Sequence, residues 1–359
     1  MSLQLGVIGA GTIGEVHAQA ALAAGQTIVA VADLDLAKAE LLAAAYPAAR
    51  ATDNLSALLE DPVIDAIVVA VPNKWHKELA IQALEAGKHV LLEKPMALSA
   101  AECGEINSVV ADTGGILQIG MVFRFGAAAQ AAKKVIDQGD LGQIYHAKAH
   151  MIRRRGVPGL GGWFTNKSLS GGGPLIDLGV HMIDLSCWLM GFPEAEHVSG
   201  KTYSFFGRRM ADYVYEDMWA GPPNLDGVCN VEDSAHALIR FAGGATLDLQ
   251  VSWAINMPLA YIPGPGFVGI FGDQGGLAFD LAGDHLDLAT ERHQRNADTR
   301  FQLPATDQFV EQAKAFANCA VSRRQPCATG AHGQQVLSII DAIYESSAAD
   351  REVEVQPAN

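Results

Sequence analysis

The chain has 359 residues, of which 49% are hydrophobic, so it is long enough for two globular domains rather than one. Its formal charge of −15 argues against nucleic acid or an anionic membrane as a partner. We expect no membrane span, because no apolar run reaches the ~20 residues that a span needs. The five cysteines are not clustered, which predicts reduced thiols and no metal site. The first apolar run starts within a few residues of Met1, so we expect no secretory signal and a cytoplasmic location.

Residues 3–35 have the pattern of a strand, a glycine turn, a helix and a second strand. The apolar run 3–8 predicts a buried parallel strand, and the segment from Thr12 to Ala24 predicts a helix that ends at Gly25. A second apolar strand, Thr27 to Ala32, ends at Asp33. Strand, glycine turn, helix and distal acid together predict a dinucleotide-binding unit.

The glycines of this turn have separate roles in that interpretation. Gly9 allows the tight turn, Gly11 lets backbone N–H groups approach a pyrophosphate, and Gly14 lets the helix pack close to the strand. The N–H groups of Thr12 and Ile13, at the start of the helix, are then available to the phosphates.

Asp33 indicates which nicotinamide cofactor is bound. Its carboxylate is placed to accept hydrogen bonds from the adenosine ribose and would repel a 2′-phosphate. Residues 34–36 include no arginine, although Lys38 lies one turn into the next helix. The sequence therefore favours NAD over NADP.

Strand and helix patterns alternate up to residue 122, which predicts a parallel sheet with helices on both faces and a first domain over residues 1–122. Pro72-Asn73 and Glu93-Lys94 follow two of these strands, so they lie at the carboxyl edge together with Gly9 and Asp33. The expected strands are 66–71, 89–92 and 116–122, and the expected helices are 36–46, 55–59, 75–86 and 99–112.

Residues 123–359 have a different pattern and predict a second α/β domain. Residues 245–253 alternate apolar and polar side chains and follow 234–241 through a glycine turn, which predicts a hairpin. Segments 267–272 and 276–280 flank another glycine turn, so we expect an open, mainly antiparallel sheet. Helices are expected at 127–138, 307–321 and 332–347, with the C-terminal helix able to pack back on the first domain.

Two places carry residues suited to hydride-transfer chemistry. Lys94 at the nucleotide edge could stabilise an alkoxide, and a solvated loop lysine is the alternative. After three glycines (171–173), Pro174 predicts the start of a helix in which Asp177 and His181 share one face. A carboxylate beside an imidazole can handle a proton, whereas a surface ion pair is the simpler interpretation. The glycines would let the backbone approach nicotinamide or sugar.

Other side chains are weaker candidates. Arg124 could reach cofactor or substrate, and a salt bridge between domains is an equal alternative. Trp163 and the arginines 153–155 could bind substrate, although a solvated basic turn is favoured for the arginines. We interpret His17, His150, Asp184 and His236 as structural.

The combination of motifs resembles the Gfo/Idh/MocA family, which includes relatives of glucose–fructose oxidoreductase and inositol dehydrogenase. The resemblance rests on the glycine turn with Asp33, on residues 71–76 (VPNKWH), on 93–95 (EKP) and on 171–181 (GGGPLIDLGVH). The hairpin from Glu232-Asp233 to Trp253 extends it over nearly the whole chain.

The family resemblance implies a Rossmann domain and NAD(P)-dependent redox chemistry on sugars or cyclitols. It also implies that the second domain, residues 123–359, serves substrate binding and oligomerisation, with its sheet packed against another subunit in a homodimer or homotetramer. It implies catalytic roles for Lys94, Asp177 and His181, and cofactor-side roles for Pro72-Asn73, His76 and Glu93.

We therefore hypothesise an NAD-dependent oxidoreductase acting on a secondary hydroxyl or ketone of a sugar, cyclitol or derivative. Two alternatives remain, a redox-assisted glycosidase with transient oxidation and a non-catalytic NAD-sensing regulator. Tyr213, Tyr215 or His150 could supply the extra acid that a glycosidase needs, and nothing general predicts the role of the aromatic segment 206–231.

Overall fold

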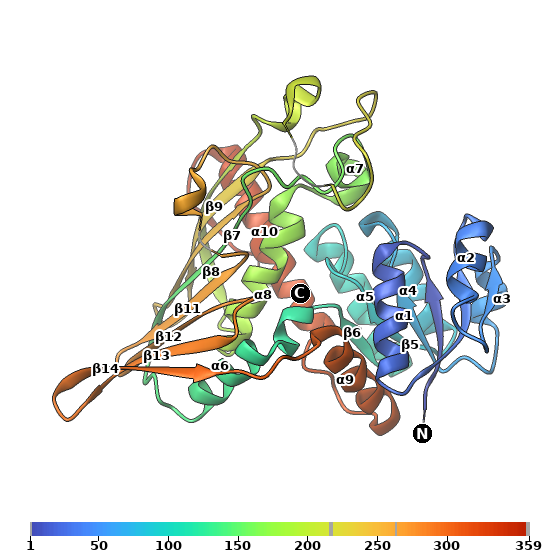
Figure 1. Cartoon of the computed structure of the whole chain (residues 1–359), viewed down its shortest axis with the longest axis horizontal. Helices are drawn as coiled ribbons and strands as arrows, with labels where there is room; N and C mark the ends of the chain where they lie inside the picture. Colours follow the sequence, from blue (N-terminus) through green and yellow to red (C-terminus); the bar gives the residue numbers. More distant parts are fainter. Residues whose placement is uncertain (1, 215–217, 263, 357–359) are drawn as a thin grey trace. The chain divides into compact units, whose positions relative to one another are not determined.

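The computed structural model describes residues 2–214, 218–262 and 264–356 (Figure 1). The chain forms two compact units, the first up to Val122 together with Asp307–Gln334, and the second over Phe123–Thr306 and from Gln335 onward. This grouping differs from the expected division in one respect, because Asp307–Gln334 belong to the first unit. Tyr215 lies outside the described residues. Within the described ranges, no helix is long and apolar enough to span a membrane.

The first unit contains a six-stranded parallel sheet in the order β3-β2-β1-β4-β5-β6. The order reverses between β1 and β4, which pair with each other, so loops after these strands flank the point where ligands bind in such sheets. The predicted last strand, 116–122, is shorter because residues 122–125 form a 3₁₀ turn. The strands are β1 Gln4–Ile8, β2 Thr27–Ala32, β3 Arg50–Thr52, β4 Ala66–Val69, β5 His89–Leu92 and β6 Leu117–Ile119.

Helices cover the sheet of the first unit. Val7, Val31 and Phe316 belong to one buried cluster, so α9 packs in the same core layer as α1 and α2. The ring of Phe309 also packs edge-on against His17, with centroids 5.6 Å apart. These contacts explain why residues 307–322 belong to this unit. The helices are α1 Thr12–Ala23, α2 Leu36–Ala43, α3 Leu55–Leu59, α4 His76–Glu85, α5 Ala100–Thr113 and α9 Gln308–Ser322.

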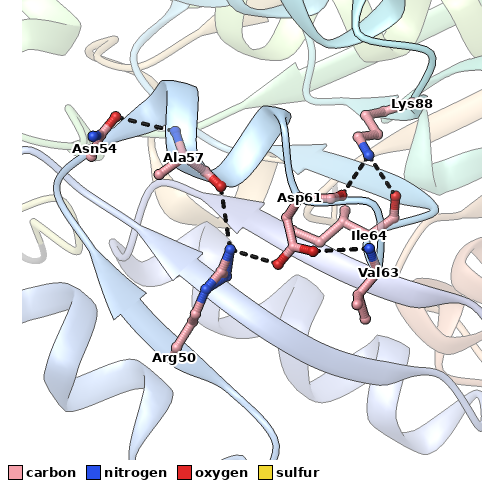
Figure 2. A network of polar contacts seen from close by, with 7 residues as sticks. All are labelled: Arg50, Asn54, Ala57, Asp61, Val63, Ile64 and Lys88. Carbon is pink, nitrogen blue, oxygen red and sulfur yellow. Dashed lines mark hydrogen bonds and ion pairs between the residues drawn. The ribbon is translucent and has the colours of Figure 1, made fainter.

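A polar network closes the loop between α3 and β4 (Figure 2). Lys88 is buried and its Nζ donates to the carbonyl oxygens of Asp61 at 2.7 Å and Ile64 at 2.9 Å. The Asp61 carboxylate in turn accepts from Arg50 at 2.7 Å and from the Val63 N–H at 2.8 Å. Lys88 directly precedes β5, so this network lies at the amino end of the sheet, away from the edge that carries Asp33 and Lys94.

The second unit contains a nine-stranded sheet in the order β14-β13-β12-β11-β7-β10-β9-β8-β15. Among the described strands of this sheet, only the pairing of β10 with β7 is parallel, so the expectation of a mainly antiparallel sheet is confirmed. The expected hairpin is β9 and β10. The strands are β7 Ile144–Ile152, β8 Ala195–Tyr203, β9 Ser234–Phe241, β10 Thr246–Ser252, β11 Phe267–Gly272, β12 Gly275–Asp280, β13 His285–Arg292, β14 Arg295–Gln302 and β15 Val353–Glu354.

Helices lie against one face of this sheet (Figure 1). Leu247 and Leu249 of β10 are buried on that face, whereas Asp248 and Gln250 alternate with them and point to the opposite face. At β8, Gly200 packs against Ile343 of the last helix. The helices of this unit are α6 Ala127–Asp137, α7 Lys167–Ser170, α8 Val180–Leu189 and most of α10 Gly330–Ala349.

Candidate functional site

The glycine turn after β1 fits a dinucleotide pyrophosphate. Gly9 has a φ of +102°, and a Cβ there would meet the Ala70 carbonyl, so a side chain is excluded. A Cβ on Gly14 would meet the Gly9 carbonyl, which explains the close approach of α1 to the turn. Gly11 differs, because no atom lies within 4 Å of where its Cβ would be. The turn is therefore packed from inside at Gly9 and Gly14 and open at Gly11, as a phosphate cradle requires.

The amino end of α1 offers backbone donors at the same place. Gly11 is the N-cap of this 12-residue helix and provides no side-chain cap, so Thr12 and Ile13 begin the helix without one. Their backbone N–H groups and the helix dipole favour an anion.

Asp33 is fixed at the end of β2. Its Oδ2 accepts the Ala10 N–H at 2.8 Å and its Oδ1 accepts the Asp35 N–H at 2.9 Å. The first of these bonds ties the carboxylate to the glycine turn. Leu34, the next residue, has a side chain that is 97% exposed. Asp33 is thus held by backbone donors and has no cationic neighbour in sequence before Lys38.

The loops after β4 and β5 are joined through His76. Its Nδ1 lies 2.7 Å from the Pro95 carbonyl and its Nε2 lies 2.8 Å from the Val71 carbonyl. Burial lowers the pKa of His76, and the two carbonyls oppose that shift. Asn73, three residues earlier, is also buried, with 6% of its surface exposed. His76 therefore fixes the two loops that carry the predicted cofactor-side residues.

Glu93 connects the predicted catalytic lysine to α1. Its Oε1 accepts from His17 Nε2 at 2.6 Å, and its Oε2 accepts the Lys94 N–H at 3.0 Å. Glu93 is buried, whereas Lys94 is partly exposed. His17 has the structural role that the sequence predicts, with the addition that it orients Glu93. The Lys94–Pro95 peptide bond is cis.

The segment that carries Asp177 and His181 differs from the expected regular helix. Residues Leu175–Gly179 form a π-helical turn, and the α-helix begins only at Val180. Asp177 therefore lies in a widened turn, while His181 lies in the first turn of α8. π turns inside helices are frequent at functional sites. Both side chains are largely buried, with 8% of each residue exposed.

Asp177 and His181 each contact an aromatic side chain of the second unit. Trp253 donates its indole N–H to Asp177 Oδ2 at 2.9 Å, and this tryptophan is 1% exposed. The ring of His181 packs on Phe123 with centroids 4.6 Å apart. Trp253 immediately follows β10, and the sequence analysis identified it only as a strand residue. A buried tryptophan usually has a partner for its N–H, which is the one signal that could have pointed to Asp177.

The three glycines before this turn have an internal role that the sequence did not predict. A Cβ on Gly172 would meet the Tyr344 hydroxyl, and a Cβ on Gly173 would meet the Glu232 carbonyl. Gly171 has a φ of +85° and ends α7. The missing side chains at 172 and 173 thus make room for other residues of this unit.

Arg124 forms an ion pair inside the second unit. Its Nε donates to Asp184 Oδ2 at 2.7 Å and its Nη2 donates to Asp184 Oδ1 at 2.5 Å. Its guanidinium also lies over the rings of Trp188 and Phe192. Burial raises the pKa of Asp184, and Arg124 opposes that shift. Arg124 is fully buried in this pair, which gives it a structural role, and its predicted contact with cofactor or substrate stays a prediction.

The aromatic segment 206–231, as far as it is described, is docked on the loop that contains Trp163. The Asn224 N–H donates to the Leu160 carbonyl at 2.8 Å, and the Thr165 hydroxyl donates to the Val228 carbonyl at 2.8 Å. Phe164 packs against Trp163, Trp219 and Trp253, with centroids 3.8, 5.2 and 6.4 Å away. Trp163 thus belongs to an aromatic cluster that extends to the tryptophan bound to Asp177.

The remaining candidates have ordinary structural contacts. Arg155 donates to the carbonyls of Arg154 and Ile255 and lies over Phe206. His150 stacks on Phe267 with centroids 4.8 Å apart, and the pKa of His150 is lowered by burial. No group of three or more His, Cys, Asp or Glu side chains in the described part of the chain could hold a metal ion.

Comparison with known proteins finds two matching domain models and relatives that match nearly the whole chain. Residues 3–121 match a family model described as an oxidoreductase family with an NAD-binding Rossmann fold, and residues 129–278 match the Gfo/Idh/MocA C-terminal domain. D-glucoside 3-dehydrogenase of Escherichia coli (strain K12) is 31% identical, over 98% of this chain and 97% of its own length. The scyllo-inositol 2-dehydrogenase (NAD(+)) of Bacillus subtilis (strain 168) is 28% identical, over 90% of this chain and 87% of its own.

Solved structures show the same fold. Levoglucosan dehydrogenase, in a complex with NADH and levoglucosan, superposes with a TM-score of 0.85 at 24% identity, over 99% of this chain and 100% of that chain. From its two matched domains and its full-length likeness to D-glucoside 3-dehydrogenase, the chain belongs to the Gfo/Idh/MocA family of NAD-binding oxidoreductases.

Proposed function

We propose that this protein is a net NAD-dependent dehydrogenase that oxidises a secondary hydroxyl of a sugar or sugar derivative. The observation that carries the proposal is Asp177, a buried carboxylate held by the Trp253 indole one turn before His181. A chain that only sensed NAD would not need this acid and base. Its likeness to D-glucoside 3-dehydrogenase and to scyllo-inositol 2-dehydrogenase (NAD(+)) supports the substrate class.

NAD rather than NADP is the cofactor we propose. The backbone N–H groups of Ala10 and Asp35 orient the Asp33 carboxylate, which suits ribose hydroxyls and repels a 2′-phosphate. Lys38 is the one nearby cation in sequence. It is exposed, and its Nζ lies 3.8 Å from the Asp35 carboxylate, which serves as its ion-pair partner in place of a 2′-phosphate. The cradle at Gly11 and the uncapped amino end of α1 fit the pyrophosphate of either cofactor.

In the proposed mechanism His181 removes the proton from the substrate hydroxyl. Lys94 stabilises the negative charge that develops on the oxygen, and Asp177 orients His181 or holds a sugar hydroxyl. NAD, when bound, supplies the acceptor for the hydride. Glu93 and His17 support Lys94 through the bond from the Lys94 N–H to the Glu93 carboxylate.

A panel of sugars, glycosides and cyclitols, followed by NADH absorbance, tests the activity. With the best substrate, His181→Ala should lose about 10²–10⁴-fold in turnover while still binding NAD. Lys94→Ala should behave similarly, with some weakening of cofactor binding. If either variant kept the parental turnover with chemistry rate-limiting, the role assigned to that residue would be wrong.

The redox-assisted glycosidase is the second candidate, because it would use the same base, lysine and nicotinamide. A net dehydrogenase accumulates NADH in step with product. A glycosidase returns the hydride to the same sugar, needs only catalytic NAD and exchanges the proton beside the transient ketone with solvent. Cleavage of a glycoside with substoichiometric NAD, no NADH build-up and deuterium incorporation from D₂O would favour the glycosidase.

We also propose that two or more copies assemble through the sheet of the second unit. The sheet face opposite the helices carries stacked pairs of histidine and phenylalanine, His150 with Phe267 and His146 with Phe271. Half-exposed aromatic rings of this kind suit a protein interface. Light scattering coupled to gel filtration should give a dimer or tetramer, and a monomer at micromolar concentration would contradict the proposal.

A further inference from the structure

A single buried carboxylate oxygen collects three donors at the start of the catalytic helix. Glu232 Oε1 accepts the Gly173 N–H at 3.0 Å, the Leu175 N–H at 3.1 Å and the Tyr344 hydroxyl at 2.9 Å. Glu232 is 6% exposed and lies two residues before β9, whereas Tyr344 is on α10. Three separate parts of the second unit therefore meet at the turn that leads into Asp177.

Two glycines give room to the main chain of Glu232 and to the side chain of Tyr344. Side chains at Gly172 and Gly173 would collide with the Tyr344 hydroxyl and with the Glu232 carbonyl. The π-helical turn begins at Leu175, one of the residues whose N–H is bound by Glu232. A carboxylate that binds the N–H groups at a helix start fixes that end of the helix.

The residue after Glu232 supports Asp177 from the other side. The Trp253 N–H donates to the Asp233 carbonyl at 2.9 Å, and the Trp253 indole donates to Asp177. Residues 232 and 233 thus hold both the turn that carries Asp177 and the tryptophan that binds its carboxylate.

We propose that Glu232 and Tyr344 are positioning residues that fix the π-helical turn and thereby align Asp177 and His181. This inference depends on the proposed function for its effect on turnover. Its structural part, that Glu232 and Tyr344 hold the turn in place, stands independently of the reaction. Both residues belong to the second unit, so neither is part of the nucleotide-binding unit.

The test compares two hydroxyl deletions on the same helix. Tyr344→Phe removes one donor to Glu232, and Ser346→Ala removes a buried hydroxyl that binds the Gly200 N–H at 2.9 Å and the Arg351 carbonyl at 2.6 Å. Glu232→Gln keeps the size of the side chain and loses its charge. We expect Tyr344→Phe and Glu232→Gln to lower kcat about tenfold, because small misplacements of catalytic groups are costly. In these two variants the dissociation constant for NAD should stay within twofold of the parent value. In Ser346→Ala both kcat and this dissociation constant should stay within twofold.

Two further readouts separate positioning from general loss of structure. The acidic limb of the kcat–pH profile should move in Tyr344→Phe and stay in place in Ser346→Ala. Hydrogen exchange of peptide 171–178 should accelerate at least tenfold in Tyr344→Phe and Glu232→Gln only. Unchanged exchange in both variants, or equal losses of kcat in Tyr344→Phe and Ser346→Ala, would overturn the inference. Faster exchange together with full turnover in His181→Ala would instead show that the proposed function is wrong and that Glu232 and Tyr344 still hold the turn.

Discussion

The hydrogen bond from Trp253 to Asp177 can be measured with a double-mutant cycle of Trp253→Phe and Asp177→Asn. Phenylalanine fills most of the space of the buried indole but removes its N–H, while asparagine keeps the shape of Asp177 and removes its charge. The bond is 2.9 Å long and Trp253 is 1% exposed, so water is poorly placed to replace the lost donor.

The expected energies follow from the charge of the acceptor. A hydrogen bond to a charged group contributes about 1.5–3 kcal/mol, whereas one between neutral groups contributes about 0.5–1.5 kcal/mol. Trp253→Phe also leaves a small cavity, whose cost of about 1 kcal/mol is common to both backgrounds. In the parent, Trp253→Phe should therefore lower the free energy of unfolding by about 2.5–4 kcal/mol. In the Asp177→Asn background the same change should cost about 1–1.5 kcal/mol less.

Urea unfolding followed by far-UV circular dichroism gives the four free energies of the cycle, with equal m-values as the check that the same transition is observed. Fluorescence is unsuitable because Trp253 is itself one of five tryptophans. Equal costs of Trp253→Phe in the two backgrounds, within about 0.3 kcal/mol, would refute a charge-assisted bond to Asp177.

Three other outcomes follow from the first unit. NAD should bind at least tenfold tighter than NADP, a difference of about 1.4 kcal/mol in binding free energy. Asp33→Ser should reduce this difference in calorimetry, and tighter NADP binding by the parent would contradict the role of Asp33. Lys88→Met removes the lysine donor from the carbonyls of Asp61 and Ile64, of which that of Asp61 keeps the Ile64 N–H at 3.2 Å. This change should lower the free energy of unfolding by about 1–3 kcal/mol in thermal unfolding, with no change in kcat. Burial lowers the pKa of His76, so the imidazole takes up a proton at a higher pH in the unfolded chain than in the folded one. The free energy of unfolding therefore decreases as the pH falls below about 6.5. His76→Gln should reduce that slope by at most about 1.4 kcal/mol per pH unit, measured by urea unfolding at about pH 7.5 and 5.5.

Much of the first unit was predictable because its signals are local. The glycine turn, the helix Thr12–Ala23 and the strand Thr27–Ala32 are encoded by adjacent residues, and their order determines the parallel sheet. The packing of α9 on α1 was not predictable in this way, because it depends on the contact of Phe309 with His17, which is remote from it along the chain.

In the second unit the sequence predicted β9, β10, β11 and β12, and β14 is among the strands that it did not predict. The hairpin of β9 and β10 has buried side chains at every second position over most of its length, which makes its period visible. The strand β14, Arg295–Gln302, is mostly exposed and pairs with β13 through polar contacts such as Arg300 with Asp287. Its sequence therefore contains no apolar alternation from which a strand could be inferred.

The candidate site also has a part that the sequence predicted and a part that it did not. Asp177 and His181 were found from their spacing after three glycines, but the reason for the glycines and the widened turn was not visible. That reason lies in Glu232, which is 59 residues beyond Gly173, and in Tyr344, which is a further 112 residues along the chain. Glycines in such a motif indicate that another group approaches the backbone closely, and only the structure shows that these groups are the main-chain carbonyl of Glu232 and the phenol of Tyr344. The motif that carries Asp177 and His181 is thus a contact surface for two other elements of its unit, and the proposed activity should depend on residues that no local pattern identifies.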